Sequence, residues 1–133
     1  MDTKPPLRCR AFLLCGRIEQ HPATKALSLV HLFTEFRMGQ FPGNTWPFGM
    51  FIELTNGRGD YALKIEFRNG KTNTLVNNIE GGTHSFPNTD YSVYVAMAME
   101  PMFVPEPGIY EFALIADGRE IGRYSYTAQG VTG

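Results

Sequence analysis

The sequence has little net charge, few cysteines and no long hydrophobic run, and each shortage excludes a class of protein. Its 12 basic and 13 acidic residues give a formal charge of −1, whereas proteins that bind nucleic acids or anionic membranes usually carry a basic excess. No apolar run approaches the roughly 18 residues that a membrane-spanning helix needs. We therefore expect no nucleic-acid partner and no membrane partner.

The two cysteines, Cys9 and Cys15, lie six residues apart in one apolar segment. If that segment is a strand, their Cα atoms are roughly 20 Å apart, which exceeds the span of about 4.4–6.8 Å of a disulfide. Two free thiols are typical of a reducing compartment. Residues 1–6 are polar and proline-rich, unlike a secretory signal. We therefore expect a cytoplasmic protein.

What the sequence does contain is the composition of one globular domain. Its 133 residues are 43% hydrophobic and 19% charged, and a chain of this length can bury roughly two thirds of its unfolded surface. Fourteen glycines and nine prolines separate short apolar runs, which is typical of an all-β protein. We predict a single β-sandwich domain over residues 1–133, with an ordered core at about residues 7–127.

Alternating apolar side chains predict most of the strands. The clearest case is residues 61–68, where Leu63, Ile65 and Phe67 alternate with polar residues, as on a half-buried strand. Asn-Gly at 69–70 and Asp-Gly at 117–118 favour hairpin turns. The strands predicted in this way are 10–19, 48–54, 61–68, 72–80 (polar and at a sheet edge), 91–99, 109–116 and 120–127.

Residues 24–39 fit two periodicities. Apolar residues from Ala26 to Phe33 fit helical spacing, with a threonine before them as a cap and a glycine after them as a stop. Read with a period of two, Leu27, Leu29 and Phe33 share one face. Because β patterns flank the segment, we favour a strand, and a helix is the alternative.

Seven or eight strands are too many for one open sheet of this size, so two sheets must cover each other. Tyr110 follows a Pro-Gly turn at the start of a late strand, like the tyrosine corner of immunoglobulin-like sandwiches. We therefore predict an all-β, immunoglobulin-like antiparallel β-sandwich. Its predicted core includes Ile52, Leu54, Leu63, Ile65, Phe67, Val93, Val95, Phe112 and Leu114.

Three stretches together carry a resemblance to known proteins. They read FLLCG at 12–16 with TKALSL at 24–29, FIELTNGRGDY at 51–61, and FVPEPGIYEF at 103–112 with DGREIG at 117–122. In this order they resemble an uncharacterised family of small bacterial all-β proteins, recorded as a domain of unknown function. The resemblance covers about residues 7–127. It implies a shared fold and carries no catalytic residue over to this chain.

Motifs for catalysis or metal binding are sparse. The three histidines have no partners at metal-ligand spacing, so we expect no metal, no cofactor and no catalytic residue. The most enzyme-like patch is residues 81–85, which include Thr83, His84 and Ser85 and which we place in a mobile loop. It lacks the strand-turn-helix context of a nucleophile elbow. An enzyme built around this patch is therefore our third hypothesis.

Aromatic residues make up 13% of the chain and give the best functional lead. Phe41, Trp46 and Phe103 fall in the two longest predicted irregular connections, residues 40–47 and 100–108. Apolar side chains in loops either cap the ends of a sandwich or form an exposed interaction patch. We favour capping and keep the patch as the functional interpretation.

Tyr94 is a second lead, because it lies opposite the apolar face of its strand. Ala96 and Ala98 beside it predict a flat, weakly polar outer surface on which a second copy could pack. The leading hypothesis is thus a non-catalytic binding or assembly module that uses a protein partner or self-association. The alternative is a small-molecule or carbohydrate binder that uses the loop aromatics near Trp46.

Overall fold

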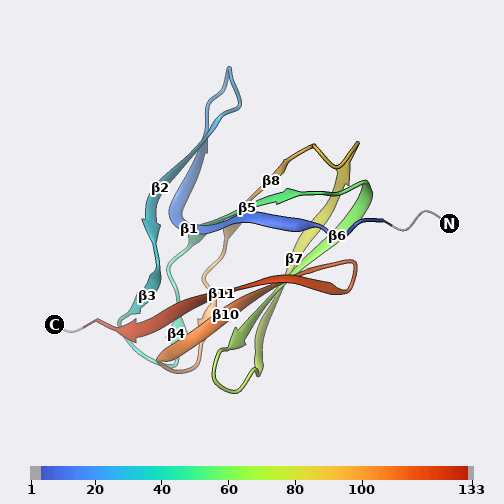
Figure 1. Ribbon diagram of the computed structural model, residues 1–133. Helices are drawn as coiled ribbons and strands as arrows, with labels where there is room; N and C mark the ends of the chain where they lie inside the picture. Colours follow the sequence, from blue (N-terminus) through green and yellow to red (C-terminus); the bar gives the residue numbers. More distant parts are fainter. Residues whose placement is uncertain (1–3, 132–133) are drawn as a thin grey trace.

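The computed structural model describes residues 4–131, which form strands joined by turns and loops (Figure 1). Within this range eleven strands make three sheets, and none of the chain is helical, so no helix here could cross a membrane. Sheet A has the order β2-β1-β5-β8, sheet B has the order β3-β11-β10-β6-β7, and β4 pairs with β9. The strands are β1 (Arg8–Gln20), β2 (Leu27–Phe33), β3 (Glu35–Met38), β4 (Gly43–Asn44), β5 (Phe48–Thr55), β6 (Gly59–Asn69), β7 (Leu75–Phe86), β8 (Val93–Met99), β9 (Phe103–Val104), β10 (Gly108–Ala116) and β11 (Arg119–Gly130).

The all-β prediction is confirmed, but seven or eight strands is too low a count. The short strands β3, β4 and β9 account for the difference. Residues 24–39 contain β2, which pairs with β1, and β3, which pairs in parallel with β11, so the helical alternative is wrong. The predicted loop at residues 81–85 is also wrong, because these residues continue β7 alongside β6.

Sheets A and B pack face to face and enclose one hydrophobic core. The rings of Phe12 in β1 and Phe112 in β10 lie 5.4 Å apart and join the two sheets across it. Eight of the nine predicted core residues are buried. Val93 is only half-buried, because β8 lies at an edge of sheet A, where the core is less covered.

Both predicted hairpins form, with different turns. Asp117 and Gly118 have φ angles of 49° and 80°, as a two-residue hairpin turn requires. The turn after Asn69 is longer: the Asn69 side-chain oxygen accepts hydrogen bonds from the N–H groups of Lys71 and Thr72, and Asn73 takes the positive φ angle instead. These side-chain hydrogen bonds take the place of those of a two-residue turn, and the loop is wider.

Hydrogen bonds and an ion pair hold the N-terminal residues 4–7 against sheet B. The Lys4 ammonium lies 2.7 Å from the Asp117 carboxylate, and the Tyr61 hydroxyl donates to the carbonyl of Pro5 at 2.6 Å. The other Asp117 oxygen accepts the N–H of Ala62. The hydrogen bond from Lys4 and that from Ala62 both lower the pKa of Asp117. One carboxylate therefore ties the N-terminal segment, the β10–β11 turn and β6 together.

This depressed pKa predicts a loss of stability in acid. The ionised form of Asp117 is favoured in the folded state, so its contribution is present above the unfolded pKa of about 3.9 and is lost as the pH falls through the lower folded value. Asp117→Asn, which tolerates the positive φ angle, should remove this acid-dependent step. Urea unfolding midpoints at neutral and acid pH measure it. Asp90→Asn is the control, since Asp90 forms no ion pair among the described residues, and an equal change in both variants contradicts the assignment.

Tyr110 locks the connection into β10. Its buried ring stacks on Phe67 with centroids 4.8 Å apart, and its hydroxyl donates to the carbonyl of Glu106 at 2.6 Å. The side chain of Tyr110 is thus bonded to the backbone four residues before it. It fixes the turn that leads from β9 to β10.

Tyr110→Phe removes this hydrogen bond and keeps the ring. We expect the free energy of unfolding to fall by about 1 kcal/mol, the usual net value of one such bond. Tyr91→Phe, at an exposed ring, should change it by less than about 0.5 kcal/mol. Equilibrium urea unfolding of the two variants tests this, and an equal effect in both shows that the bond contributes nothing.

Candidate functional site

The structure separates the three loop aromatics. Phe41 is half-buried against the core, whereas Trp46 is 80% exposed and Phe103 is 51% exposed. Phe103 lies directly opposite Asn44 in the β4–β9 pair, and Trp46 follows two residues along the same segment. Trp46 and Phe103 therefore project from the exposed side of this pair, while Phe41 caps the core. The expected capping of the core is found at Phe41, and Trp46 and Phe103 are exposed.

The space beside Trp46 is small. Residues around Trp46 and Phe48 line a cavity of about 60 Å³, whereas pockets for organic ligands usually measure about 300–1,000 Å³. Thr45, between Asn44 and Trp46, is buried and accepts the N–H of Met102 through its hydroxyl. The segment is thus held firmly while the indole itself lies outside any enclosed pocket of useful size.

The exposure of Trp46 predicts that it contributes little to folding. Trp46→Ala should change the free energy of unfolding by less than about 0.5 kcal/mol. Phe48→Ala, two residues away at a buried ring, should cost about 3–5 kcal/mol. Urea unfolding measures both. A large cost for Trp46→Ala would show that the indole caps the core.

Tyr94 lies in β8, on the outer face of sheet A. It pairs with Glu53 of β5, and its ring contacts Phe51 with centroids 5.4 Å apart. The register places Leu13 of β1, Phe51 of β5 and Ala96 of β8 side by side on this same face. Tyr94 is therefore part of a row of apolar side chains that crosses three strands.

We call this row, with its neighbours, the outer apolar face. Leu32 and Tyr94 are each 59% exposed, and Leu13 is 37% exposed. Its members are Leu13, Leu32, Phe51, Tyr94, Ala96 and Ala98. The ion pair between Arg10 and Glu53, 3.5 Å apart, lies at its rim. An apolar centre with charged groups at the rim is the usual composition of a protein interface.

A two-stranded arm borders this face. β1 pairs with β5 only as far as Cys15 and then continues paired with β2 alone, so the end of this hairpin projects from sheet A (Figure 1). A Cβ at Gly49 would lie 2.9 Å from Cγ1 of Ile18. Only glycine lets the arm approach β5 this closely.

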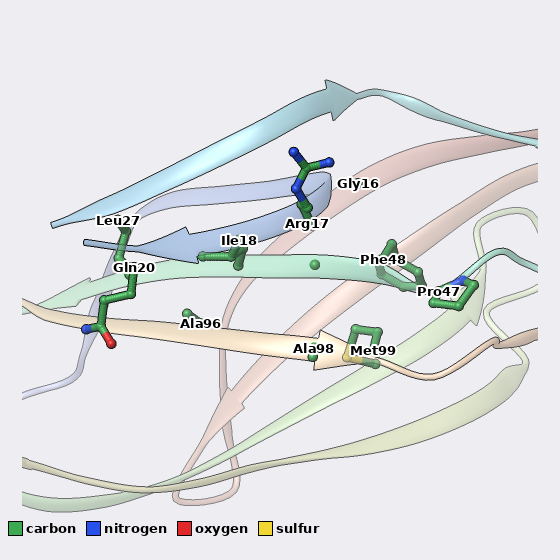
Figure 2. Close-up of a pocket in the computed structure, with 11 residues that line it drawn as sticks. Gly16, Arg17, Ile18, Gln20, Leu27, Pro47, Phe48, Ala96, Ala98 and Met99 are labelled. Atoms are coloured by element: carbon green, nitrogen blue, oxygen red, sulfur yellow. The ribbon is translucent and has the colours of Figure 1, made fainter. Parts of the chain in front are cut away.

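Between the arm and β8 lies a groove of about 440 Å³. Figure 2 shows Ile18 and Leu27 of the arm on one side, β5 in the middle, and Ala96 and Ala98 of β8 on the other side. Gly49 lines it between them. The groove walls are mostly apolar, and its floor is built from residues with small side chains or none.

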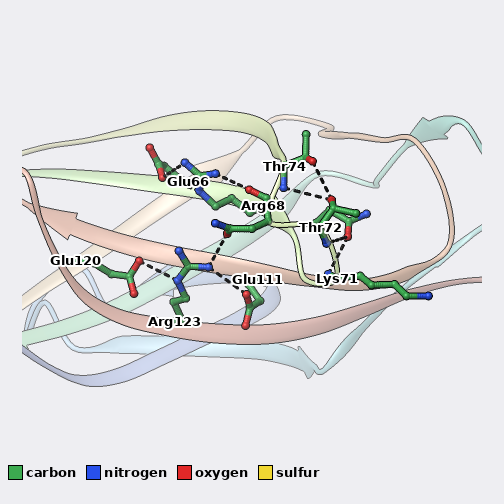
Figure 3. Close-up of polar contacts among 10 residues, drawn as sticks. Glu66, Arg68, Lys71, Thr72, Thr74, Glu111, Glu120 and Arg123 are labelled. Carbon is green, nitrogen blue, oxygen red and sulfur yellow. Dashed lines mark hydrogen bonds and ion pairs between the residues drawn. The ribbon is translucent and has the colours of Figure 1, made fainter.

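The outer face of sheet B is of the opposite character. Arg123 of β11 contacts Glu120 at 2.8 Å and Glu111 of β10 at 3.2 Å, and Arg68 contacts Glu66 on β6 at 2.8 Å (Figure 3). The hydrogen bond from Arg68 lowers the pKa of Glu66. These ion pairs balance the charges of the residues that form them, and Leu75 and Ile109 are exposed on strands of the same sheet.

His84 and Ser85 do not pair with each other in the patch of residues 83–85. The His84 ring lies 2.7 Å from the carbonyl oxygen of Gly81, and the Ser85 hydroxyl donates to Asp60 at 2.5 Å. His84 and Ser85 are neighbours on a strand, so their side chains point to opposite faces. Within residues 4–131 no three His, Cys, Asp or Glu side chains form a group that could hold a metal ion.

The two cysteines are free, as predicted. Burial raises the pKa of the Cys15 thiol, which has no exposed surface, and also raises the pKa of Cys9. Raised pKa values keep both groups as thiols at neutral pH, the unreactive form.

Comparisons with known proteins identify the family. The model of a family of unknown function, DUF6941, matches residues 10–129. This chain belongs to that family. The resemblance seen in the sequence is thereby confirmed, and no activity comes with it. None of the curated proteins compared with the chain matches it.

Two solved structures are similar in fold. One is the Pseudomonas fluorescens alkylpurine DNA glycosylase AlkC, bound to DNA containing an abasic site analogue, with a TM-score of 0.60 and 7% identity. It matches 96% of this chain, which spans only 31% of the AlkC chain. The other is an immunoglobulin-like protein from Pseudomonas aeruginosa, with a TM-score of 0.46, 14% identity and coverage of 93% of this chain and 97% of that one. At 7% identity, the likeness to AlkC extends to the fold alone.

Proposed function

We propose that this protein is a non-catalytic binding module with an immunoglobulin-like sandwich, and that the outer apolar face of sheet A binds a protein partner. The observation that carries the proposal is the contrast between the two outer faces. Sheet B presents ion pairs such as Arg123 with Glu120, and its exposed Leu75 and Ile109 lie on separate strands. Sheet A presents Leu13, Leu32 and Tyr94 to solvent on one face. A contiguous exposed apolar patch on one face marks an interaction site.

The immunoglobulin-like assignment is supported by the hydrogen bond from Tyr110 to Glu106 at the entry to β10, which matches the tyrosine corner of that architecture. The protein-binding assignment is favoured over the small-molecule alternative near Trp46, because the cavity there is only about 60 Å³. An exposed apolar face with a charged rim suits another protein surface.

The test compares two double variants in a pull-down from a lysate of the source organism. Leu13→Lys with Tyr94→Lys places two charges on the outer apolar face. Ile109→Lys with Leu75→Lys is the matched control, since both side chains are exposed on sheet B strands. We expect partners captured by the unmodified chain to be retained by the control and reduced about tenfold or more by the sheet A variant, because buried unpaired charges are costly.

Circular dichroism first establishes that both double variants are folded. Equal capture by the two variants contradicts the proposal, since it shows that the captured proteins do not use sheet A. A captured small molecule displaced by Trp46→Ala, with no protein lost in the sheet A variant, supports the alternative near Trp46.

A further inference from the structure

Strand β8 has one open edge. Val93–Met99 pairs with β5 along one side, and no other strand within residues 4–131 pairs with its opposite side. Because adjacent residues of a strand direct their backbone groups to alternate sides, every second residue of β8 presents its N–H and C=O groups to this edge. Its sequence, VYVAMAM, contains no charge, no proline and no glycine.

The other edge strands carry the usual protections against pairing. β2 is interrupted at His31, whose φ angle is 61°. β3 has only four residues, and Glu35 and Arg37 form an ion pair on it. β7 contains Glu80 and a bulge near Gly82, which has a φ angle of 80°. Charges, short length and bulges prevent a foreign strand from pairing with an edge, and β8 lacks all three.

The core is also open along β8. On the inner side of the strand Val93, Met97 and Met99 are only half-buried, although all three pack against the core. Residues of this kind are usually buried in a finished sheet. The open backbone edge and the uncovered side chains therefore lie on the same strand and would both be satisfied by one additional strand.

We propose that the missing strand is β8 of a second copy, paired antiparallel about a twofold axis to join two A sheets into one of eight strands. This inference goes beyond the proposed function, because it assigns a contact at the open edge of sheet A, next to the outer apolar face. The register that pairs all seven residues of β8 places Ala96 opposite Ala96 of the second copy. In this register the outward side chains of both copies lie on the same face of the joined sheet. A register shifted by one residue would place them on opposite faces.

This register is sterically and electrostatically self-complementary. It places the Tyr94 ring of each copy opposite Ala98 of the other, next to the groove that Ala98 and Gly49 line. A large projecting ring thus meets the smallest side chains of the face. β8 carries no charge, so the twofold axis brings no like charges of this strand together.

The size of the contact sets the expected affinity. A seven-residue strand pair with the adjoining side chains covers less than the roughly 800 Å² per partner of a standard interface. We therefore expect a reversible dimer with a dissociation constant of about 1–100 μM. Because no ion pair on β8 joins the copies, high salt should not weaken it.

The experiment uses two opposite charges at the position that faces itself. Ala96 is exposed, so Ala96→Lys and Ala96→Glu should both fold. Sedimentation velocity over a concentration series should show the unmodified chain dimerising and each variant remaining monomeric, with a dissociation constant raised about tenfold or more. An equimolar mixture of the two variants should dimerise again, because opposite charges then face each other across the twofold axis.

Ala62→Lys is the control, since Ala62 is also exposed but lies on a central strand of sheet B. This variant should dimerise like the unmodified chain. Amide hydrogen exchange should show every second amide of β8 protected in the dimer and exposed in the monomer.

An unmodified chain that stays monomeric throughout the series overturns the inference, as does a mixture of the variants that stays monomeric. The proposed function survives either result if the sheet A double variant still loses captured proteins. Dimerisation without lysate partners makes a second copy the sole partner of sheet A.

Discussion

The rest of this structure depends on one constraint, the burial of a single core between two sheets. With no helix among the described residues to cover a sheet, each sheet must cover the other, so one face of every central strand is fixed by contacts such as Phe12 with Phe112. Side chains alternate along a strand, which leaves the opposite face free of this demand. Function in such a fold is therefore carried by the outward residues, the edges and the ends.

The two sheets use that freedom differently. Sheet B balances outward charges in pairs, as Arg123 does with Glu111 and Glu120. Sheet A exposes Tyr94 and Leu32 and ends at a strand with unpaired backbone groups. An exposed apolar face and an unprotected strand edge are each available for contact with another chain. Sheet A carries both, the face across β1, β5 and β8 and the edge along β8.

Alternation in the sequence was enough to predict the long strands and nearly all of the core, because burial imposes a period of two on residues such as Leu63 and Ile65. The strands β4 and β9 have only two residues each, which is too short to show an alternating pattern. The Gly-Gly pair at 81–82 indicated a loop, although β7 continues through it. Within the candidate site, the sequence pointed to Tyr94 because it alternates with the apolar residues of its strand. Leu13 and Phe51 were missed because they lie within continuous apolar runs, although their parity opposite the buried residues was a usable signal.

Small side chains give the outer face of sheet A a defined shape next to the arm. Gly49 cannot be enlarged without displacing Ile18 of the arm, so the packing of the arm itself keeps the floor of the groove low. Ala96 and Ala98 extend this low floor to the edge of β8, where Tyr94 rises beside them. One strand thus carries both a recess and a projection at fixed spacing. A twofold axis matches each to the other, whereas any unrelated partner would have to supply both shapes itself.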